Sequence, residues 1–176
     1  MKKILTALVI LFSFNYAQEA NSSQATTQQQ KALSFKFKDI NGFDIKVTET
    51  KEGIRFDTIK DKDVILFFYI YDGAPCQREL ELFRDYLKEN KNVEIVAIEL
   101  KGLDRQKLKE YAAKKKLDNI HMVVGKEAMD FVQYIAYRAQ WPGTVPFIII
   151  VDKDGKVKHI QIGAMGKEEL DKVLKK

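Results

Sequence analysis

One cysteine, Cys76, is the side chain of this protein best suited to covalent chemistry. It lies in residues 69–80, YIYDGAPCQREL, between an apolar run and an amphipathic one. Two cysteines separated by two residues at such a strand-to-helix junction form a redox motif. Here Gly73 stands at the first cysteine position, so the motif is reduced to its second half. Dithiol exchange needs one thiol to attack and a second to release the mixed disulfide. Cys76 alone can form a mixed disulfide, which an external thiol must then resolve.

Two interpretations of Cys76 follow from its position. A thiol at a helix N-terminus is acidified by the free N–H groups and the helix dipole. Cys76 also shares an apolar stripe with Leu80, Phe83 and Leu87, at spacings of four, three and four, which predicts that it points inward. Burial raises a thiol pKa. Cys76 is therefore either a small buried hydrophobe or a reactive thiol to which the glycine at position 73 opens access.

Glutamate, tryptophan and histidine are the other residue types with potential for chemistry or partner contact. Glu79 is interpreted either as a group that tunes or deprotonates Cys76, or as a first-turn glutamate that the helix dipole favours. Trp141, the single tryptophan, either contacts a partner at a groove edge or packs under its own loop. His121 and His159 have no cysteine or second histidine nearby in sequence, and a zinc or copper centre needs several such ligands together. No metal and no cofactor are therefore expected.

Composition limits the function classes. The chain has 176 residues, of which 45% are hydrophobic, as expected for one globular domain with a substantial core. The formal net charge is +5, and it falls to 5 − 2 = +3 without Lys2 and Lys3. That charge is too small and too scattered to indicate nucleic-acid binding. The lysine run 114–116 is interpreted as a solvated helix end.

The N-terminal 31 residues have the composition of an export signal and a tether. Residues 1–17 combine Lys2 and Lys3 with the apolar run 4–14, which predicts a signal peptide cleaved near Ala17 and a periplasmic protein. A retained signal anchor at the membrane is the alternative. Residues 18–31 contain no large apolar side chain and are predicted to be a disordered tether. In an oxidising compartment, a lone cysteine is buried, capped by a small thiol, or paired with another protein.

Hydrophobic periodicity predicts an α/β domain over residues 32–176. Two alternating runs on either side of Asn41-Gly42 predict a β-hairpin, and Glu52-Gly53 predicts a second turn. The run 64–71 is almost continuously apolar, as in a central strand that is buried on both faces. Met122, Met129 and Met165 are expected in the core. The other expected strands are 93–100, 120–124, 147–151 and 157–162, and the expected helices are 75–90, 104–116, 126–139 and 166–176. The last two strands form a hairpin, so the sheet is predicted to be mixed.

Several motifs, in a constant order, carry a resemblance to a known family. Residues 68–79 run from strand through the cysteine motif into a helix, and Glu79 follows Cys76 by three residues. Residues 144–146 (TVP) precede the hairpin 147–157 (FIIIVDKDGKV), and Gly163 with residues 168–170 leads into the last helix. Together these motifs resemble the thioredoxin superfamily and, within it, the exported TlpA/ResA/CcmG-like branch. The resemblance covers about residues 33–176.

The resemblance implies a thioredoxin-like fold, with an N-terminal hairpin extension, and a peptide-binding loop. Pro146 is expected to be cis, and the backbone of Val145 is expected to pair with an extended substrate chain by strand addition. Glu79 matches a glutamate typical of this branch. The family pattern places an aromatic residue and then Cys-x-x-Cys where this chain has Asp72 and then Gly73 through Cys76. The nucleophilic cysteine and the preceding aromatic residue are both replaced.

These observations lead to one functional hypothesis and one alternative. The protein is predicted to be an exported TlpA-type protein of thiol–disulfide metabolism that binds an extended polypeptide or a redox partner protein. The contact is expected through Asp72, Gly73, Val145, Pro146 and Trp141, with at most monothiol exchange at Cys76 assisted by Glu79. The alternative is a non-catalytic binding module in cytochrome maturation or envelope assembly.

Overall fold

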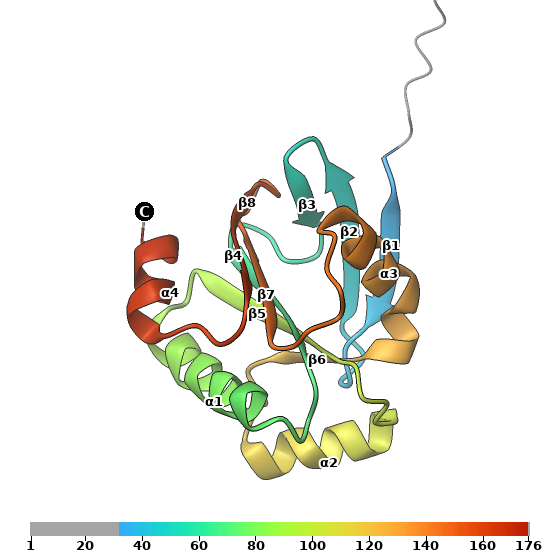
Figure 1. Ribbon diagram of the computed structural model, residues 1–176, viewed down its shortest axis with the longest axis vertical. Helices are drawn as coiled ribbons and strands as arrows, with labels where there is room; N and C mark the ends of the chain where they lie inside the picture. Colours follow the sequence, from blue (N-terminus) through green and yellow to red (C-terminus); the bar gives the residue numbers. More distant parts are fainter. Residues whose placement is uncertain (1–31, 176) are drawn as a thin grey trace, which may run out of the picture. The chain divides into compact units, whose positions relative to one another are not determined.

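The computed structural model describes residues 32–175 (Figure 1). The predicted signal peptide (1–17) and tether (18–31) lie outside the described residues. The strands are β1 (Ser34–Lys38), β2 (Asp44–Thr50), β3 (Gly53–Phe56), β4 (Asp63–Tyr69), β5 (Val93–Glu99), β6 (His121–Val124), β7 (Phe147–Val151) and β8 (Val157–Ile162). The helices are α1 (Ala74–Glu89), α2 (Arg105–Lys115), the 3-10 helix η1 (Gly125–Ala128), α3 (Met129–Arg138) and α4 (Lys167–Leu174).

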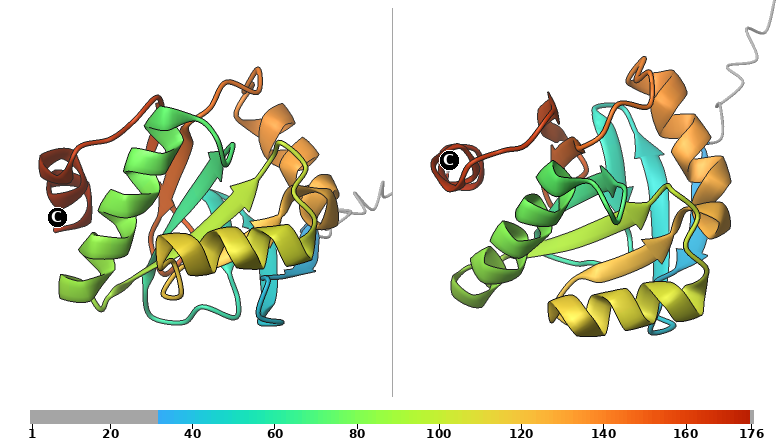
Figure 2. Two further views of the ribbon diagram at one scale, coloured as in Figure 1. Left: turned by 90° about the horizontal axis from the view of Figure 1, so that it is seen from below. Right: turned by 60° about the horizontal axis from the view of Figure 1, so that its bottom comes forward.

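A five-stranded mixed sheet forms the centre of the domain, with strand order β6-β5-β4-β7-β8. Strands β4, β5 and β6 are mutually parallel, whereas β7 is antiparallel to β4, and β8 is antiparallel to β7. The parallel strands are connected through helices and the antiparallel pair β7–β8 through a tight turn (Figures 1 and 2). The predicted α/β class and mixed sheet are confirmed.

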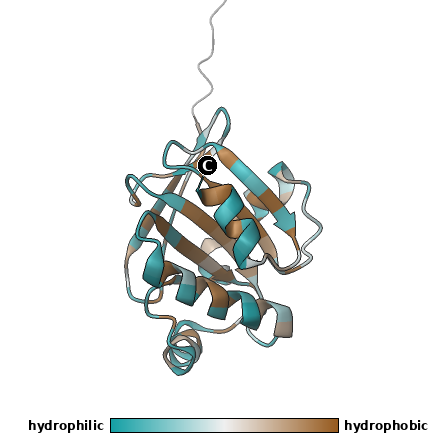
Figure 3. Ribbon diagram, turned by 90° about the vertical axis from the view of Figure 1, so that its left-hand side faces the viewer, coloured by the Kyte–Doolittle hydropathy of each residue, from teal (hydrophilic) through white to brown (hydrophobic). Residues whose placement is uncertain are grey.

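The sheet separates two hydrophobic clusters, because alternate side chains of β4 point to opposite faces. Ile65, Phe67 and Tyr69 pack with residues of α1, α2 and α4. Val64, Leu66 and Phe68 pack with α3 and the N-terminal strands. Figure 3 shows hydrophobic colour along the central strands and alternating hydrophilic and hydrophobic colour along the helices. The continuous apolar run in β4 reflects this burial on both faces.

The N-terminal extension is a three-stranded antiparallel sheet, of order β1-β2-β3. The predicted hairpin is β1 and β2, and Gly42 in its turn has φ 92°, a backbone conformation that glycine adopts without strain. The run after Glu52 adds β3 as a third strand, paired with β2. A Cβ atom at Gly53 would lie 2.7 Å from the carbonyl oxygen of Gly155, so these two turns approach closely at their glycines.

Helix α2 has its predicted bounds, and local capping explains them. The Asp104 carboxylate accepts a hydrogen bond from the backbone N–H of Lys107 at 2.9 Å, which caps the N-terminus. Lys116 ends the helix in the left-handed conformation, with φ 56°. None of the helices among residues 32–175 is long and apolar enough to cross a bilayer.

The third predicted helix is wrong in its first turn. Residues 125–128 form the 3-10 helix η1, and the α-helix begins only at Met129. Met129 is the first residue of the α-helix and is 40% exposed, against the core position predicted for it, whereas Phe131 is buried. Met122 and Met165 are buried as predicted.

Candidate functional site

The N-terminus of α1 follows directly from the carboxyl end of the central strand β4. Gly73 is the N-cap residue, and its carbonyl accepts the first helical hydrogen bond from Gln77 N–H at 2.9 Å. Pro75 lies in the first turn, where its missing N–H is not needed. The N–H of Gly73 donates to the carbonyl of Ile70 at 3.3 Å and closes the turn that leaves β4. The half motif therefore occupies the predicted strand-to-helix junction.

Cys76 is buried beneath this turn, with 1% of its surface exposed. Its apolar stripe faces the core as predicted, since Leu80, Phe83 and Leu87 are buried in the same cluster. Burial raises the pKa of the Cys76 thiol above its ordinary value, although hydrogen bonds from the backbone of Ile70 and of Cys76 partly lower it. The replacement of the first cysteine by glycine has not opened the sulfur to solvent. These features favour the first of the two interpretations, a buried thiol held in its neutral form.

Two tyrosines that the sequence analysis did not single out lie in the core around Cys76. Tyr69, at the end of β4, is in the same buried cluster as Cys76, and Tyr111 of α2 packs against that cluster. Neither hydroxyl has a hydrogen-bond partner among residues 32–175. Burial raises the pKa of Tyr69 well above its usual value and that of Tyr111 to about 12, so both are neutral donors. The one available signal was the alternation in β4, which places Tyr69 on the face of Cys76.

Glu79 is buried one turn after Cys76 and has an incomplete set of partners. Its Oε2 accepts a hydrogen bond from Met165 N–H at 3.1 Å, while Oε1 is buried without a partner within residues 32–175. Burial raises the pKa of Glu79 to about 7, against a smaller lowering by the Met165 hydrogen bond. A carboxyl group with this pKa can gain or lose a proton near neutral pH. Ionised Glu79 also raises the pKa of Cys76, so it opposes rather than promotes the thiolate.

The loop before β7 lies beside the start of α1. The Val145–Pro146 peptide bond is cis, as expected. Phe68 of β4 pairs with Phe147 of β7, so the loop that ends at Pro146 lies at the same end of the sheet as Tyr69. The backbone N–H and C=O of Val145 make no backbone hydrogen bond to any of residues 32–175. The loop therefore offers one free donor and one free acceptor at the end of the sheet where Cys76 lies.

Trp141 lies under this loop rather than at a groove edge. Only 6% of its surface is exposed, and its ring stacks on Phe147 at a centroid distance of 4.6 Å. The indole Nε1–H donates to the carbonyl oxygen of Thr144 at 2.7 Å. The predicted direct contact between Trp141 and a partner is therefore wrong. The indole ring packs in the core, and its N–H group holds the loop.

Asp72, the last of the predicted contact residues, is exposed in the turn between β4 and α1. Its carboxylate forms an ion pair with Lys101, in the loop after β5, and this hydrogen bond lowers the pKa of Asp72. The Lys101 ammonium also lies over the ring of Tyr71, 5.5 Å from its centroid. The position that is aromatic in the family pattern thus carries a negative charge that is already paired. In the described part of the chain, no three His, Cys, Asp or Glu side chains gather closely enough to hold a metal ion.

Comparison with known proteins identifies one matching family and two similar proteins. The model of the AhpC/TSA family matches residues 28–160. The thiol-disulfide oxidoreductase ResA of Bacillus thuringiensis (strain Al Hakam) is 32% identical over 127 residues, which are 70% of this chain and 68% of that protein. ResA of Bacillus anthracis matches over the same length with the same identity. Over the aligned share of both chains, the sequence resemblance to the ResA-like branch is confirmed.

Solved structures agree on the fold. StoA from Bacillus subtilis has a TM-score of 0.58 at 21% identity, with 80% of this chain and 95% of that chain covered. A thioredoxin family protein from Chlorobium tepidum TLS has a TM-score of 0.61 at 19% identity, with 82% and 93% covered. A secreted disulfide oxidoreductase of Mycobacterium tuberculosis has a TM-score of 0.56 at 19% identity, with 80% and 94% covered. The thioredoxin-like fold is thereby confirmed.

Proposed function

This chain belongs to the AhpC/TSA family of thioredoxin-fold proteins, and we propose that it binds an extended polypeptide or a redox partner rather than reducing disulfides catalytically. It is a homologue of ResA-type thiol-disulfide oxidoreductases with a single cysteine. The observation that carries the proposal is the state of that cysteine: Cys76 is 1% exposed, and burial raises its thiol pKa. The fold is retained, while the nucleophile of the dithiol reaction is replaced by Gly73.

The binding contact rests on the free backbone groups of Val145. A strand of the partner pairs with its N–H and C=O, which is the strand-addition mode of peptide recognition. The partner chain then passes the turn at Gly73, and the ion pair of Asp72 with Lys101 borders its path. Trp141 supports the contact from below by holding Thr144. Strand addition uses backbone atoms of the loop and needs no thiol at position 73.

Any redox step is limited to monothiol exchange. The Cys76 thiolate would attack one sulfur of a partner disulfide, forming one new S–S bond and releasing the other partner sulfur as a thiolate. A low-molecular-weight thiolate must then attack the partner sulfur of the mixed disulfide, which releases the Cys76 thiolate and leaves the partner disulfide-bonded to the small thiol, because the chain has no second cysteine. The buried position and raised pKa of Cys76 make this exchange slow. In this proposal Glu79, with a pKa of about 7, takes up the thiol proton and becomes neutral, so that it no longer raises the pKa of Cys76.

The proposed compartment is the periplasm. The charged and apolar pattern of residues 1–14 supports export, and one similar structure is of a protein described as secreted. An oxidising compartment also fits a thiol that is buried, since an exposed single cysteine there would be oxidised or capped. The alternative function is a binding module without any thiol chemistry, in cytochrome maturation or envelope assembly, and the burial of Cys76 favours it.

Crosslinking in cells separates these possibilities. A photoreactive amino acid at Thr144, which is exposed beside Val145, is expected to capture a partner, whereas the same group at Lys153 in the β7–β8 turn serves as the control. If capture persists in Cys76→Ser, the protein is a binding module. If capture is lost, thiol exchange contributes to recognition. The proposal is contradicted if the protein reduces insulin at a rate near that of a dithiol thioredoxin.

A further inference from the structure

Strand β8 forms one edge of the five-stranded sheet and is largely open on its outer side. Among residues 32–175, its outer side is contacted by backbone only at its start, where Gly53 pairs with Lys156 and Val157 N–H donates to Glu52 O at 3.1 Å. Open edges with free hydrogen-bonding groups are templates for another strand, and proteins usually protect them with charge, proline or a covering element.

The hydrogen-bond phase of β8 shows which groups are free. Gly163 N–H donates to Pro146 O at 2.8 Å, so this pair faces inward toward β7. In an antiparallel ladder, inward pairs alternate with outward ones. Gln161 and His159 therefore face inward, and the N–H and C=O groups of Ile160 and Ile162 point to the open edge. Two successive outward residues supply two donors and two acceptors for a pairing strand.

The side chains of the same two residues are unusually exposed for isoleucine. Ile160 is 49% and Ile162 is 53% exposed, and both lie on one face of β8 because they are two residues apart. Their register partners are Ile149 and Phe147, which belong to the cluster under α3. The apolar surface of the core thus continues outward to the edge strand. Exposed contiguous apolar surface beside free backbone groups indicates an interaction site.

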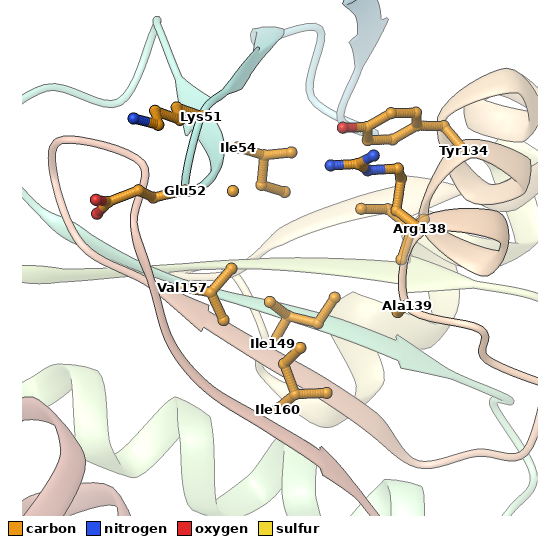
Figure 4. Close-up of a pocket in the computed structure, with 11 residues that line it drawn as sticks. Lys51, Glu52, Ile54, Tyr134, Arg138, Ala139, Ile149, Val157 and Ile160 are labelled. Atoms are coloured by element: carbon orange, nitrogen blue, oxygen red, sulfur yellow. The ribbon is translucent and has the colours of Figure 1, made fainter.

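A pocket of about 280 Å3 opens beside Ile160, between the N-terminal sheet, α3 and the β7–β8 pair. Its apolar walls come from three elements: Figure 4 shows Ile54 facing Val157, Ile149 and Ile160, with Arg138 reaching across from α3. The volume suits one or two apolar side chains. The mouth is polar and is formed by Lys51, Glu52, Tyr134 and Arg138.

The charge at the pocket mouth is positive. Glu52 is offset by Lys156, at 3.6 Å, whereas Lys51 has no ion-pair partner in the described part of the chain. Arg138 forms an ion pair with Glu49, at 3.6 Å between Nε and Oε1, so the excess positive charge at the mouth is that of Lys51. A carboxylate at the mouth would complete the contacts of Lys51 and Arg138.

We propose that the open edge of β8 binds an extended polypeptide segment that carries alternating apolar residues and one acidic residue. The segment pairs with the outward groups of Ile160 and Ile162 by strand addition. Its apolar side chains cover these two isoleucines and one enters the pocket, while its carboxylate meets Arg138 and Lys51. The free backbone groups select a strand as the occupant, and the positive mouth selects an acidic one. This site is separate from Cys76 and Val145, and does not depend on the function proposed for them.

The test uses a blocked, fluorescent eight-residue peptide that alternates valine and threonine and ends in glutamate. With the full-length protein, fluorescence anisotropy is expected to give saturable binding. Ile160→Thr and Ile162→Thr should each weaken binding about tenfold, because covering the exposed half of an isoleucine is worth about that factor. Arg138→Gln should weaken binding of the glutamate peptide, and leave binding of a glutamine peptide unchanged. Matched controls are Leu33→Thr, another exposed apolar residue, and Arg55→Gln, another exposed arginine.

Amide hydrogen exchange locates the contact. The N–H groups of Ile160 and Ile162 are expected to exchange fast in the free protein and to be protected by the peptide, while those of His159 and Gln161 are protected throughout. Absence of saturable binding, or protection at Thr144 and Val145 instead, overturns the proposal. Slow exchange at Ile160 and Ile162 before peptide is added, with a dimer mass in solution, also overturns it, because a second copy then occupies the edge. The Cys76→Ser and Thr144 variants test the other site and should leave this binding unchanged.

Discussion

A Cβ atom placed on Gly73 would lie 3.4 Å from Sγ of Cys76. The two positions of the half motif are therefore in van der Waals contact, as the two residues of a disulfide must be. The same Cβ atom would lie 2.9 Å from Cγ1 of Ile70, so a side chain at position 73 must displace that residue slightly. The chain lacks the first thiol, but its backbone places position 73 next to the second.

Gly73→Cys is expected to restore a dithiol site. Mild oxidation should form an internal disulfide with Cys76, and the reduced protein should gain insulin-reduction activity that the parent lacks. Displacement of Ile70 should lower the free energy of unfolding by about 1 kcal/mol, at the lower end of the cost of overpacking. Mass spectrometry after thiol blocking, an insulin turbidity assay and urea unfolding measure the three effects.

The control for this gain of function is Gly73→Cys combined with Cys76→Ser. This variant has a single cysteine at position 73 and should form mixed disulfides without turning over. Equal insulin reduction by both variants would contradict the prediction, because it would mean that the second thiol is not used. Gly73→Ser adds a similar volume without a thiol and separates the packing cost from the chemistry.

Alkylation of Cys76 is expected to be slow in the native protein. The thiol is 1% exposed and its pKa is raised by burial, so reagent access and thiolate population are both reduced. At pH 8, iodoacetamide labelling should be at least about a hundredfold slower than in urea, and its rate should still rise above pH 9. Fast native labelling, with a midpoint below the value of about 8.5 for a free thiol, would show that Cys76 is a working nucleophile.

Glu79 should make stability depend on pH. Its pKa is about 7 in the folded state and about 4.3 in the unfolded chain, so the folded protein binds the proton more tightly. The corresponding stability is present at low pH and is lost as the pH rises through 7. Between pH 5 and pH 8, this group alone should lower the free energy of unfolding by roughly 2–3 kcal/mol. Urea unfolding at several pH values measures the slope.

Glu79→Gln isolates that contribution. The amide oxygen can still accept the Met165 hydrogen bond, but the variant has no carboxyl group to ionise, so its pH dependence over this range should be flatter. Glu89→Gln changes a glutamate on the same helix that is exposed and paired with Lys167, and its pH profile should match the parent. A parallel shift of the Glu79→Gln profile, without a change of slope, would refute the assignment.

Trp141→Phe should loosen the loop that carries Val145. The substitution removes the indole hydrogen bond to Thr144 and leaves part of the space beside Phe147 empty, at a cost of about 1–3 kcal/mol. Urea midpoints measure the loss, with Tyr137→Phe as the control because Tyr137 is 82% exposed. Crosslinking through Thr144 should fall in the tryptophan variant and remain in the tyrosine variant.

Much of the fold follows from local patterns in the sequence. The continuous apolar run of β4, the alternation in β1 and β2 and the stripe from Cys76 to Leu87 each predicted an element and its buried face. These predictions hold because hydrophobic periodicity reports burial directly. Asp104 likewise predicted the start of α2, because its cap is made with a backbone group three residues away. The 3-10 turn before α3 was missed, since it depends on how residues 125–128 meet the rest of the domain.

The candidate site, like the fold, could be predicted from the sequence only in part. The residue types alone determined that the chain has one thiol, at a strand-to-helix junction, and that dithiol turnover lacks its first cysteine. Tertiary structure decided whether that thiol is accessible, since burial of Cys76 depends on the helices and strands that close around it. It also decided the raised pKa of Glu79, the place of Trp141 under its loop and the open edge at Ile160. Each depends on contacts between segments distant in sequence, and no local pattern records which side chains such segments bring together.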